Sequence, residues 1–288
     1  MIMNRNQFAD IILQRLIDQK EEISQQYNSS KDKIGYFWVD DLLPEELALE
    51  INQVFPQEKE MVLKKSLKED KYIAVQMDQY HPILEEIIYA FQDERIVNLI
   101  AEICEIKQPI PDSSLYAGGL SMMGNRQFLQ PHLDNSHDAK RELWRVLNLL
   151  YYVTPDWKEE YGGNLEIWPN GLKNDQITIF SKFNRLAVMA THNDSLHSVS
   201  PIKFKGFRKC VSNYYFSKEP LRETDSFHVT SFRGRPEQKV LDQVLQVDNA
   251  LRMGVRKVFK KGVVENPHIY KKEEKLSLIH ISEPTRPY

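Results

Sequence analysis

The chain has 288 residues, of which 41% are hydrophobic and 27% are charged, which suits a globular protein with a sizeable core. Its formal net charge is −3, whereas a protein that binds duplex nucleic acid usually has a strong basic excess, so we expect no nucleic-acid partner. Two cysteines are too few for a disulfide-stapled secreted scaffold, and we therefore expect reduced thiols and a cytoplasmic location.

Residues 1–110 are predicted to form helices with short strands between them. Phe8–Gln26 repeats apolar residues at intervals of three and four, as an amphipathic helix does. Charged residues interrupt this segment, so it is neither a signal peptide nor a membrane span, and no membrane partner is expected. Tyr36–Val39 is predicted as a short strand, and Asp41–Pro44 opens a helix with proline in its first turn. Ile83–Cys104 predicts one or two more helices.

Short β-rich runs separated by turn residues follow from residue 115. They are LYAGGLSMM (115–123), RQFLQPHLD (126–134), WRVLNLLYYVT (144–154), NLEIWP (164–169), QITIFS (176–181), RLAVMAT (185–191), HSVSPI (197–202) and FRKCVSNYYFS (207–217). Such a series predicts a jelly-roll, the double-stranded β-helix, and argues against alternating βαβ units. We therefore predict a mainly β, α+β fold with N-terminal helices packed on the β core and a C-terminal helix at Glu237–Lys261.

We expect a single domain over residues 1–275, with a helical part at 1–110, a β-helix core at 111–217 and an extension at 218–275. The last residues, LSLIHISEPTRPY (276–288), do not continue the preceding pattern. The run LSLIHISEPTR resembles a reading-frame translation of a transposase adapter used in sequencing libraries. We interpret this tail as an artefact and do not count His280 as a candidate ligand. The natural C-terminus is then expected to be missing.

A histidine and a carboxylate stand two positions apart at His132-Leu133-Asp134, after an apolar run. At a strand end this spacing puts both side chains on one face. Two imidazoles and one carboxylate form the facial triad that binds Fe(II) and leaves open positions for an oxidant. The third ligand must come from a distant strand, and His197, which opens HSVSPI, is the candidate. The sequence thus predicts that His132, Asp134 and His197 bind a metal and carry the catalysis.

Arg208 begins a strand of its own eleven residues after His197. In a β core these two strands can be neighbours, which would bring the guanidinium close to the metal. Arginine stays charged when it is enclosed, and its planar fork fits a carboxylate with two hydrogen bonds. Arg208 is therefore predicted to anchor the far carboxylate of a keto-diacid.

The HLD motif, the distal HSVSP and the following FRKCVSNYYF together resemble the 2-oxoglutarate/Fe(II)-dependent oxygenases, and more narrowly their prolyl-4-hydroxylase-like branch, over roughly residues 35–217. GGNLEIW (162–168) is similar to the Gly-Gly-x-Leu strand of that branch. The resemblance implies iron bound by His132, Asp134 and His197, and 2-oxoglutarate held by Arg208. It also implies that Tyr116, on an early core strand, donates to the same carboxylate. Prolyl hydroxylases proper usually have lysine where Arg208 stands, which weakens any prediction of proline as the substrate.

The resemblance further implies a dioxygenase that uses Fe(II), 2-oxoglutarate and O2, with ascorbate as a candidate reductant. Such an enzyme would hydroxylate an unactivated C–H bond of a peptidyl or small amino-acid-like substrate and release succinate and CO2. Related halogenases replace the carboxylate ligand with a small residue, so Asp134 favours hydroxylation. Two alternatives stay open: a metal-dependent cupin-like isomerase or hydrolase, which forms no succinate, and a non-catalytic β-barrel binding module. The sequence predicts neither the particular substrate nor the oligomeric state.

A second H-x-D motif, His192-Asn193-Asp194, competes with the first. Its downstream histidine would be His228, with Lys239 eleven residues further on, but the segment around Lys239 is polar and helix-like. We therefore interpret His192 and Asp194 as turn residues. The neighbours of the first motif, His137 and Asp138, are interpreted as an exposed loop.

Two other groups of residues have more than one interpretation. Asn148, Leu150 and Tyr152 share one face of their strand by the period of two, and Asn148 could reach the site or simply pack within the sheet. Arg233 and Arg235, in FHVTSFRGRPE (227–237), could bind an anionic substrate group or cap the following helix. The sequence does not separate these alternatives.

Overall fold

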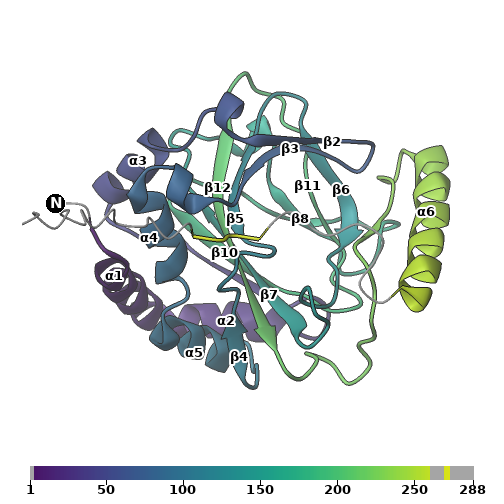
Figure 1. Ribbon diagram of the computed structural model, residues 1–288, viewed down its shortest axis with the longest axis horizontal. Helices are drawn as coiled ribbons and strands as arrows, with labels where there is room; N and C mark the ends of the chain where they lie inside the picture. The colour runs from purple at the N-terminus through teal and green to yellow at the C-terminus, as the bar shows by residue number, and fades with distance from the viewer. Residues whose placement is uncertain (1–2, 260–268, 273–288) are drawn as a thin grey trace, which may run out of the picture.

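The computed structural model describes residues 3–259 and 269–272. The interpreted artefact tail, 276–288, and the last two residues of the predicted C-terminal helix, 260 and 261, lie outside the described residues. Within them, thirteen strands form one curled antiparallel sheet, with six α-helices around it (Figure 1). This confirms the predicted mainly β fold with a double-stranded β-helix core. None of the described helices is both long and apolar enough to cross a membrane.

The sheet runs in the order β1–β10–β7–β12–β5–β3–β6–β11–β8–β9, with β2 on β3, β4 on β12 and β13 on β6. Because β3 pairs with both β5 and β6, it joins the two halves of the sheet. Residues of β5, β7 and β12 line the same cavity as residues of β6 and β11, so the two halves face each other across it. The strands are β1 (Tyr36–Val39), β2 (Val62–Lys65), β3 (Glu69–Ala74), β4 (Pro109–Pro111), β5 (Gly119–Met123), β6 (Phe128–Leu133), β7 (Trp144–Tyr152), β8 (Leu165–Ile167), β9 (Ile177–Ile179), β10 (Arg185–Ala190), β11 (His197–Val199), β12 (Arg208–Ser217) and β13 (Ser231–Phe232).

Five helices lie before β4 in the chain, with β1, β2 and β3 among them, and the sixth follows β13 and lies on the opposite side of the molecule in Figure 1. They are α1 (Arg5–Asp18), α2 (Lys20–Ser30), α3 (Glu45–Gln53), α4 (Pro82–Ala90), α5 (Glu94–Ile103) and, after the core, α6 (Lys239–Val258). The single helix predicted at Phe8–Gln26 is in fact two, which meet at Gln19. Neither glycine nor proline marks that position, so the apolar period alone does not reveal the break.

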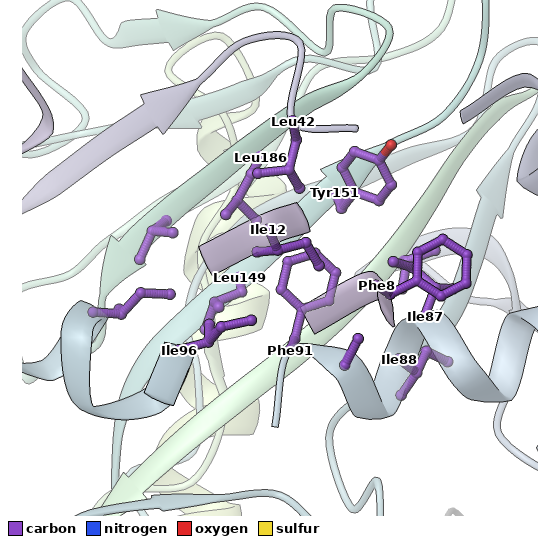
Figure 2. Close-up of a cluster of buried hydrophobic side chains, with 14 of the residues drawn as sticks. Phe8, Ile12, Leu42, Ile87, Ile88, Phe91, Ile96, Leu149, Tyr151 and Leu186 are labelled. Atoms are coloured by element: carbon purple, nitrogen blue, oxygen red, sulfur yellow. The ribbon is translucent and has the colours of Figure 1, made fainter. Parts of the chain in front are cut away.

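The main apolar core lies between the N-terminal helices and the outer face of β7 and β10 (Figure 2). Phe8 and Ile12 of α1 pack there with Leu149 and Tyr151 of β7, and each is at most 1% exposed. Burying one such side chain stabilises the fold by about 1.5–3 kcal/mol. Because side chains alternate along a strand, the residues between them on β7 point to the other face, into the cavity. The helices therefore cover one face of the sheet, and the other face lines the cavity.

The β2–β3 hairpin is an element that the sequence analysis missed. β2 is mostly exposed, and β3 is only partly buried until Ala74, so neither has the apolar run or the clean alternation that predicts a strand. β3 nevertheless pairs with β5 and β6, the strand that carries His132. It therefore adds Glu69 and Lys71 to the cavity wall.

Candidate active site

The pairing of β6 with β11 sets His132 directly opposite His197. Residues paired across an antiparallel ladder lie close enough for their side chains to meet on one face, and the two imidazole centroids are 4.2 Å apart. Asp134 follows the last residue of β6 by one position. One ligand atom from each of the three side chains lies within 4.8 Å of the other two. The structure thus brings together the three residues that the sequence analysis proposed as metal ligands.

Backbone carbonyls orient both imidazoles. The Nδ1 of His132 lies 2.9 Å from the carbonyl oxygen of Gln130, and the Nδ1 of His197 lies 2.9 Å from that of Ser195. Since a carbonyl can only accept, each Nδ1 carries the proton and donates it, and each Nε2 keeps its lone pair for a metal. These Nε2 atoms lie 3.5 Å and 3.8 Å from the two carboxylate oxygens of Asp134.

The carboxylate of Asp134 fits a cation as well. Its Oδ2 atom is buried and has no hydrogen-bond partner among the described residues. A buried polar atom without a partner needs an explanation, and a bound ion is one of the few that apply. Two imidazole nitrogens and one carboxylate oxygen are also the donor set of a facial Fe(II) triad. The three side chains therefore suit Fe(II) in both their chemistry and their placement.

Electrostatics favour the protonation states that bind metal. Burial lowers the pKa of His197 to about 4, and the neighbouring His132 acts in the same direction. Burial alone would raise the pKa of Asp134, but Arg145 and the two histidines hold it well below its usual range. At neutral pH the site therefore offers a neutral His197 and an ionised Asp134, as metal coordination requires.

Arg145 is a site residue that the sequence analysis missed. Its Nη1 lies 3.5 Å from Oδ1 of Asp134, and its guanidinium carbon lies 4.6 Å from the centre of the Tyr214 ring. On β7, Leu147 pairs with Tyr215 but Arg145 pairs with the next residue of β12, so Val146 is one extra residue, a β-bulge. A bulge reverses the alternation of side chains. Arg145 consequently shares the inner face with Asn148, which a strict period of two excludes.

Arg208 opens into the same cavity as the metal ligands, a space of about 300 Å³. Its side chain is buried, and its Nη2 contacts the Sδ atom of Met123 at 2.8 Å, while its Nε has no partner among the described residues. A thioether sulfur is a weak acceptor, and a buried cation is strongly destabilising unless it is paired. This guanidinium is therefore suited to an anion that enters the cavity.

Tyr116 also lines the cavity, but the expectation that it lies on a core strand is wrong. β5 begins at Gly119, and Tyr116 lies in the bend before it. The carboxylate of Asp112 accepts from the backbone N–H of Tyr116 and of Ala117, each at 2.9 Å, and from that of Gly118 at 3.2 Å. In this bend a side-chain carboxylate thus accepts the backbone hydrogen bonds that a neighbouring strand would otherwise accept. The role predicted for the Tyr116 hydroxyl stays a prediction.

The rival H-x-D motif forms no such site. His192 is buried, and its Nδ1 accepts from the backbone N–H of Asp194 at 3.1 Å. The Asp194 side chain is 75% exposed and pairs with Arg222 at 3.1 Å. The two side chains therefore serve a turn, as predicted, and within the described residues the only cluster that could hold a metal is the one at His132.

Two interpretations of neighbouring residues change with the structure. His137 is not exposed: it is buried, its Nδ1 lies 2.7 Å from the Ser136 hydroxyl, and its ring packs against Trp144. Asp138 accepts from backbone N–H groups of its own loop. Arg233 pairs with Asp242 of α6 at 2.6 Å and Arg235 with Glu166 of β8 at 2.9 Å, so both hold the start of α6 on the core. Of the two readings of these arginines, the contacts favour the structural one.

The buried His192 predicts an acid-sensitive fold. Burial lowers its pKa to about 3, and Arg222 adds to the effect. In the unfolded chain this histidine is protonated below about pH 6.5, whereas in the folded chain it stays neutral down to about pH 3. Protonation therefore favours the unfolded state, and stability falls as the pH falls through that window. The free energy of unfolding can be measured by urea titration at about pH 7.5 and pH 5 for the wild type and for His192→Asn. We expect its decrease between the two pH values to be about 2 kcal/mol smaller in the variant. Equal drops would contradict the assignment.

Comparison with known proteins finds a family match over the β core and similar folds among solved structures. Residues 118–217 match the family model described as the 2OG-Fe(II) oxygenase superfamily. The fold is similar to that of a prolyl-4-hydroxylase from Pseudomonas putida, with 13% identity over 68% of this chain and 98% of that one and a TM-score of 0.50. A prolyl hydroxylase from Trichoplax adhaerens, in complex with a hypoxia inducible factor oxygen degradation domain peptide fragment, gives 20% identity, 70% and 92% coverage and a TM-score of 0.51. Prolyl 4-hydroxylases from Phytophthora capsici give 17% identity, 88% and 82% coverage and a TM-score of 0.51.

These structural likenesses, at low identity, show the fold, and the family match covers the strands that carry all three candidate metal ligands and Arg208. The resemblance seen in the sequence is therefore confirmed: residues 118–217 match the model of the 2OG-Fe(II) oxygenase superfamily, and the fold is similar to that of prolyl hydroxylases. The cofactors of this superfamily are Fe(II), 2-oxoglutarate and O2, as expected. No curated protein matches the chain.

Proposed function

We propose that this protein is a hydroxylase that uses Fe(II), 2-oxoglutarate and O2 to oxidise an unactivated C–H bond of a peptidyl or small amino-acid-like substrate. One observation carries the proposal: His132, Asp134 and His197 converge in the wall of a cavity that also holds the buried guanidinium of Arg208, for which the described residues provide no ion pair. A metal site alone would suit many reactions. The added cation supplies the second requirement, a place for the distal carboxylate of 2-oxoglutarate.

In this proposal each residue has a distinct task. His132, Asp134 and His197 would hold Fe(II), which when bound supplies O2 activation coupled to the decarboxylation of 2-oxoglutarate. Arg208 would bind the distal carboxylate and fix how deeply the cosubstrate enters. Arg145, 3.5 Å from the Asp134 carboxylate, would hold that ligand ionised and limit its rotation. The enclosing strands would keep water away from the reacting carbon.

A second cavity of about 690 Å³ offers room for the substrate. It shares His132 and Asp134 with the first cavity but does not include Arg208, and its outer wall comes from the segment around Phe227 and from α6. We propose that 2-oxoglutarate occupies the first cavity and that the substrate approaches the metal through the second. The peptide fragment bound by the Trichoplax adhaerens relative makes a peptidyl substrate a reasonable class to test.

Three other expectations accompany this proposal. We propose that residues 1–275 act as one domain, because α1, α4, β7 and β10 share one apolar core. A cytoplasmic location stays a prediction; Cys104 and Cys210 are both free and buried. The Asp134 carboxylate favours hydroxylation, since a bound halide would need the position that this ligand takes.

The product distinguishes the proposal from its alternatives. The full chain, loaded with Fe(II), would be incubated with 2-oxoglutarate, O2 and pools of short peptides and amino-acid-like compounds, and analysed by mass spectrometry. We expect substrate-stimulated succinate in equal amount to a product that has gained one oxygen atom. Conversion of a compound without succinate would indicate a cupin-like isomerase or hydrolase. Failure to retain Fe(II) would indicate a binding module.

Tyr116→Phe tests the proposed second contact to 2-oxoglutarate. A hydroxyl that donates to a carboxylate contributes enough that its loss should weaken 2-oxoglutarate binding about tenfold and leave Fe(II) binding unchanged. Tyr89→Phe is the matched control, because its hydroxyl donates to the Ser113 carbonyl outside both cavities. Dissociation constants from anaerobic titration measure the effect. An unchanged constant in Tyr116→Phe would remove this residue from the cosubstrate site.

A further inference from the structure

The second cavity carries more cationic than acidic side chains, although the whole chain has a net charge of −3. Two of its cations are offset by nearby carboxylates: Lys71 lies 3.0 Å from Glu69, and Arg252 lies 2.9 Å from Asp248. A third, Arg145, lies 3.5 Å from Asp134. The cationic side chains in its wall are Lys71, Arg141, Arg145, Arg252 and Arg256, and the carboxylates are Glu69, Asp134 and Asp138.

Arg141 has the clearest surplus of charge. Its guanidinium carbon lies 3.8 Å from the centre of the Phe227 ring, and its Nη2 donates to the backbone carbonyl of Arg256 at 3.4 Å. The described residues give it no ion pair, since the nearby Asp138 carboxylate accepts from the N–H groups of Glu142 and Leu143. Stacking on an aromatic face fixes the plane of a guanidinium but does not neutralise it. The N–H groups of Arg141 are thus held in place with donor capacity left for an oxyanion.

The loop before β7 holds Arg141 in an unusual backbone conformation. Arg141 has a φ of 60°, in the left-handed region that arginine rarely adopts, and its N–H donates to the Asp138 carbonyl at 3.3 Å. Asp138 therefore fixes the loop through both its carbonyl and its carboxylate. Such backbone strain persists only where surrounding contacts hold it, and it often accompanies a functional site.

Metal binding would add to the positive charge. In the described structure Asp134 is the ion-pair partner of Arg145, whose Nε is buried without a hydrogen-bond partner. Once that carboxylate coordinates a divalent metal, it offsets Arg145 less, and the metal's own charge must be counted too. The loaded site would therefore attract an anion more strongly than the metal-free one.

An apolar surface adjoins the arginines. Phe227, Val229 and Phe232 line one side of the cavity, and Leu251 and Val255 of α6 line its outer edge with 68% and 42% of their surfaces exposed. Exposed aliphatic side chains at the edge of a concave site suit a ligand with an apolar body.

We infer that the ligand of this cavity is an amphiphilic acid, whose carboxylate or phosphate group binds Arg141 and whose apolar body lies along Phe227 and α6. The inference rests on the proposed function for the reaction that follows, but not for binding itself. It narrows the substrate class from peptidyl or amino-acid-like compounds in general to those that carry an anionic group beside an apolar segment.

Three probes with the same six-carbon body test the inference: hexanoate, hexyl phosphate and the neutral hexanamide. Ligand-observed NMR titrations would use the full chain with Zn(II) in place of Fe(II) and with saturating 2-oxoglutarate, so that Arg208 is already occupied. The series would be repeated on the metal-free chain. We expect one of the acids to bind about tenfold more tightly than hexanamide. The acid that binds more tightly distinguishes a carboxylate site from a phosphate site.

Variants assign the effect to a residue. Arg141→Gln should reduce the affinity for the acid to that for hexanamide, Arg141→Lys should lie between, and Arg95→Gln should behave as the wild type because Arg95 pairs with Asp93 and Asp10 outside both cavities. Arg141→Lys keeps the charge, so it remains informative if Arg141→Gln is poorly folded. Equal affinity for acids and amide, or the same acid affinity in the Arg141 and Arg95 variants, overturns the inference. Acid binding to the Zn(II) protein, together with no substrate-stimulated succinate from the Fe(II)-loaded protein and the compound pools, would overturn the proposed function and leave the inference intact.

Discussion

Replacing His132 by alanine is expected to lower the affinity for Fe(II) by more than about 100-fold, because loss of an outer-shell partner alone often costs 10–100-fold and His132 is proposed as a direct ligand. The Nε2 of His132 and that of His197 lie within 4 Å of the same carboxylate. Removing one imidazole leaves two ligands, too few for the facial triad. Turnover of 2-oxoglutarate should fall with metal binding. The measurement is an anaerobic Fe(II) titration followed by a succinate assay.

His81→Ala is the control for this prediction. His81 lies at the start of α4 and lines neither cavity, so its loss should leave Fe(II) affinity unchanged. Both variants need the same thermal unfolding curve as the wild type before their affinities are compared. If His132→Ala retains Fe(II) with wild-type affinity, the metal is not held where we place it.

Replacing Arg208 by alanine should raise the dissociation constant of 2-oxoglutarate by about 100-fold, because truncating one partner of a buried, hydrogen-bonded charge pair typically costs 2–5 kcal/mol. Fe(II) binding should persist, which separates this effect from that of His132→Ala. Arg208→Lys keeps the charge but loses the planar fork, so an intermediate constant is expected.

Stability provides a second measurement on Arg208. Without 2-oxoglutarate the wild-type guanidinium is a buried cation to which the described residues give no ion pair. Its Nη2 contacts the weak acceptor Met123 Sδ, and its carbon lies 5.4 Å from the centre of the Tyr152 ring. Removing it therefore relieves an unfavourable burial. We expect Arg208→Ala to unfold at a temperature no lower than the wild type without 2-oxoglutarate, and to gain less from its addition. Equal stabilisation of both proteins by 2-oxoglutarate would place the cosubstrate elsewhere.

Most of the β core could be predicted from the sequence because its strands alternate between a sealed face and a cavity face. β7, β10 and β12 begin within one residue of the predicted runs. The β2–β3 hairpin could not be predicted, because its exposed residues have no apolar face and it is held by pairing with β5 and β6. The local pattern of apolar residues predicts which positions are buried, but it does not show which distant segments pair with each other.

Some residues of the site could likewise be predicted from the sequence, and others could not. His132, Asp134 and Arg208 are predictable because a two-residue spacing and a strand start fix their faces. Arg145 was hidden by the extra residue at Val146, which reverses the alternation of β7. Its one signal in the sequence is a charge inside an apolar strand. Tyr116 was predicted to line the site from a core strand. It does line the cavity, but it lies in a bend held by Asp112, so the structure does not support the reason for that prediction.

The central claim is that one Fe(II) and one 2-oxoglutarate occupy the same cavity, and an anaerobic titration tests it most directly. The full chain would receive Fe(II) and then 2-oxoglutarate while the visible spectrum is recorded. The account predicts a weak metal-to-ligand charge-transfer band that saturates at one equivalent of each, is absent in His132→Ala and needs far more 2-oxoglutarate in Arg208→Ala. A protein that retains no Fe(II), or that binds Fe(II) and 2-oxoglutarate without this band, would contradict it.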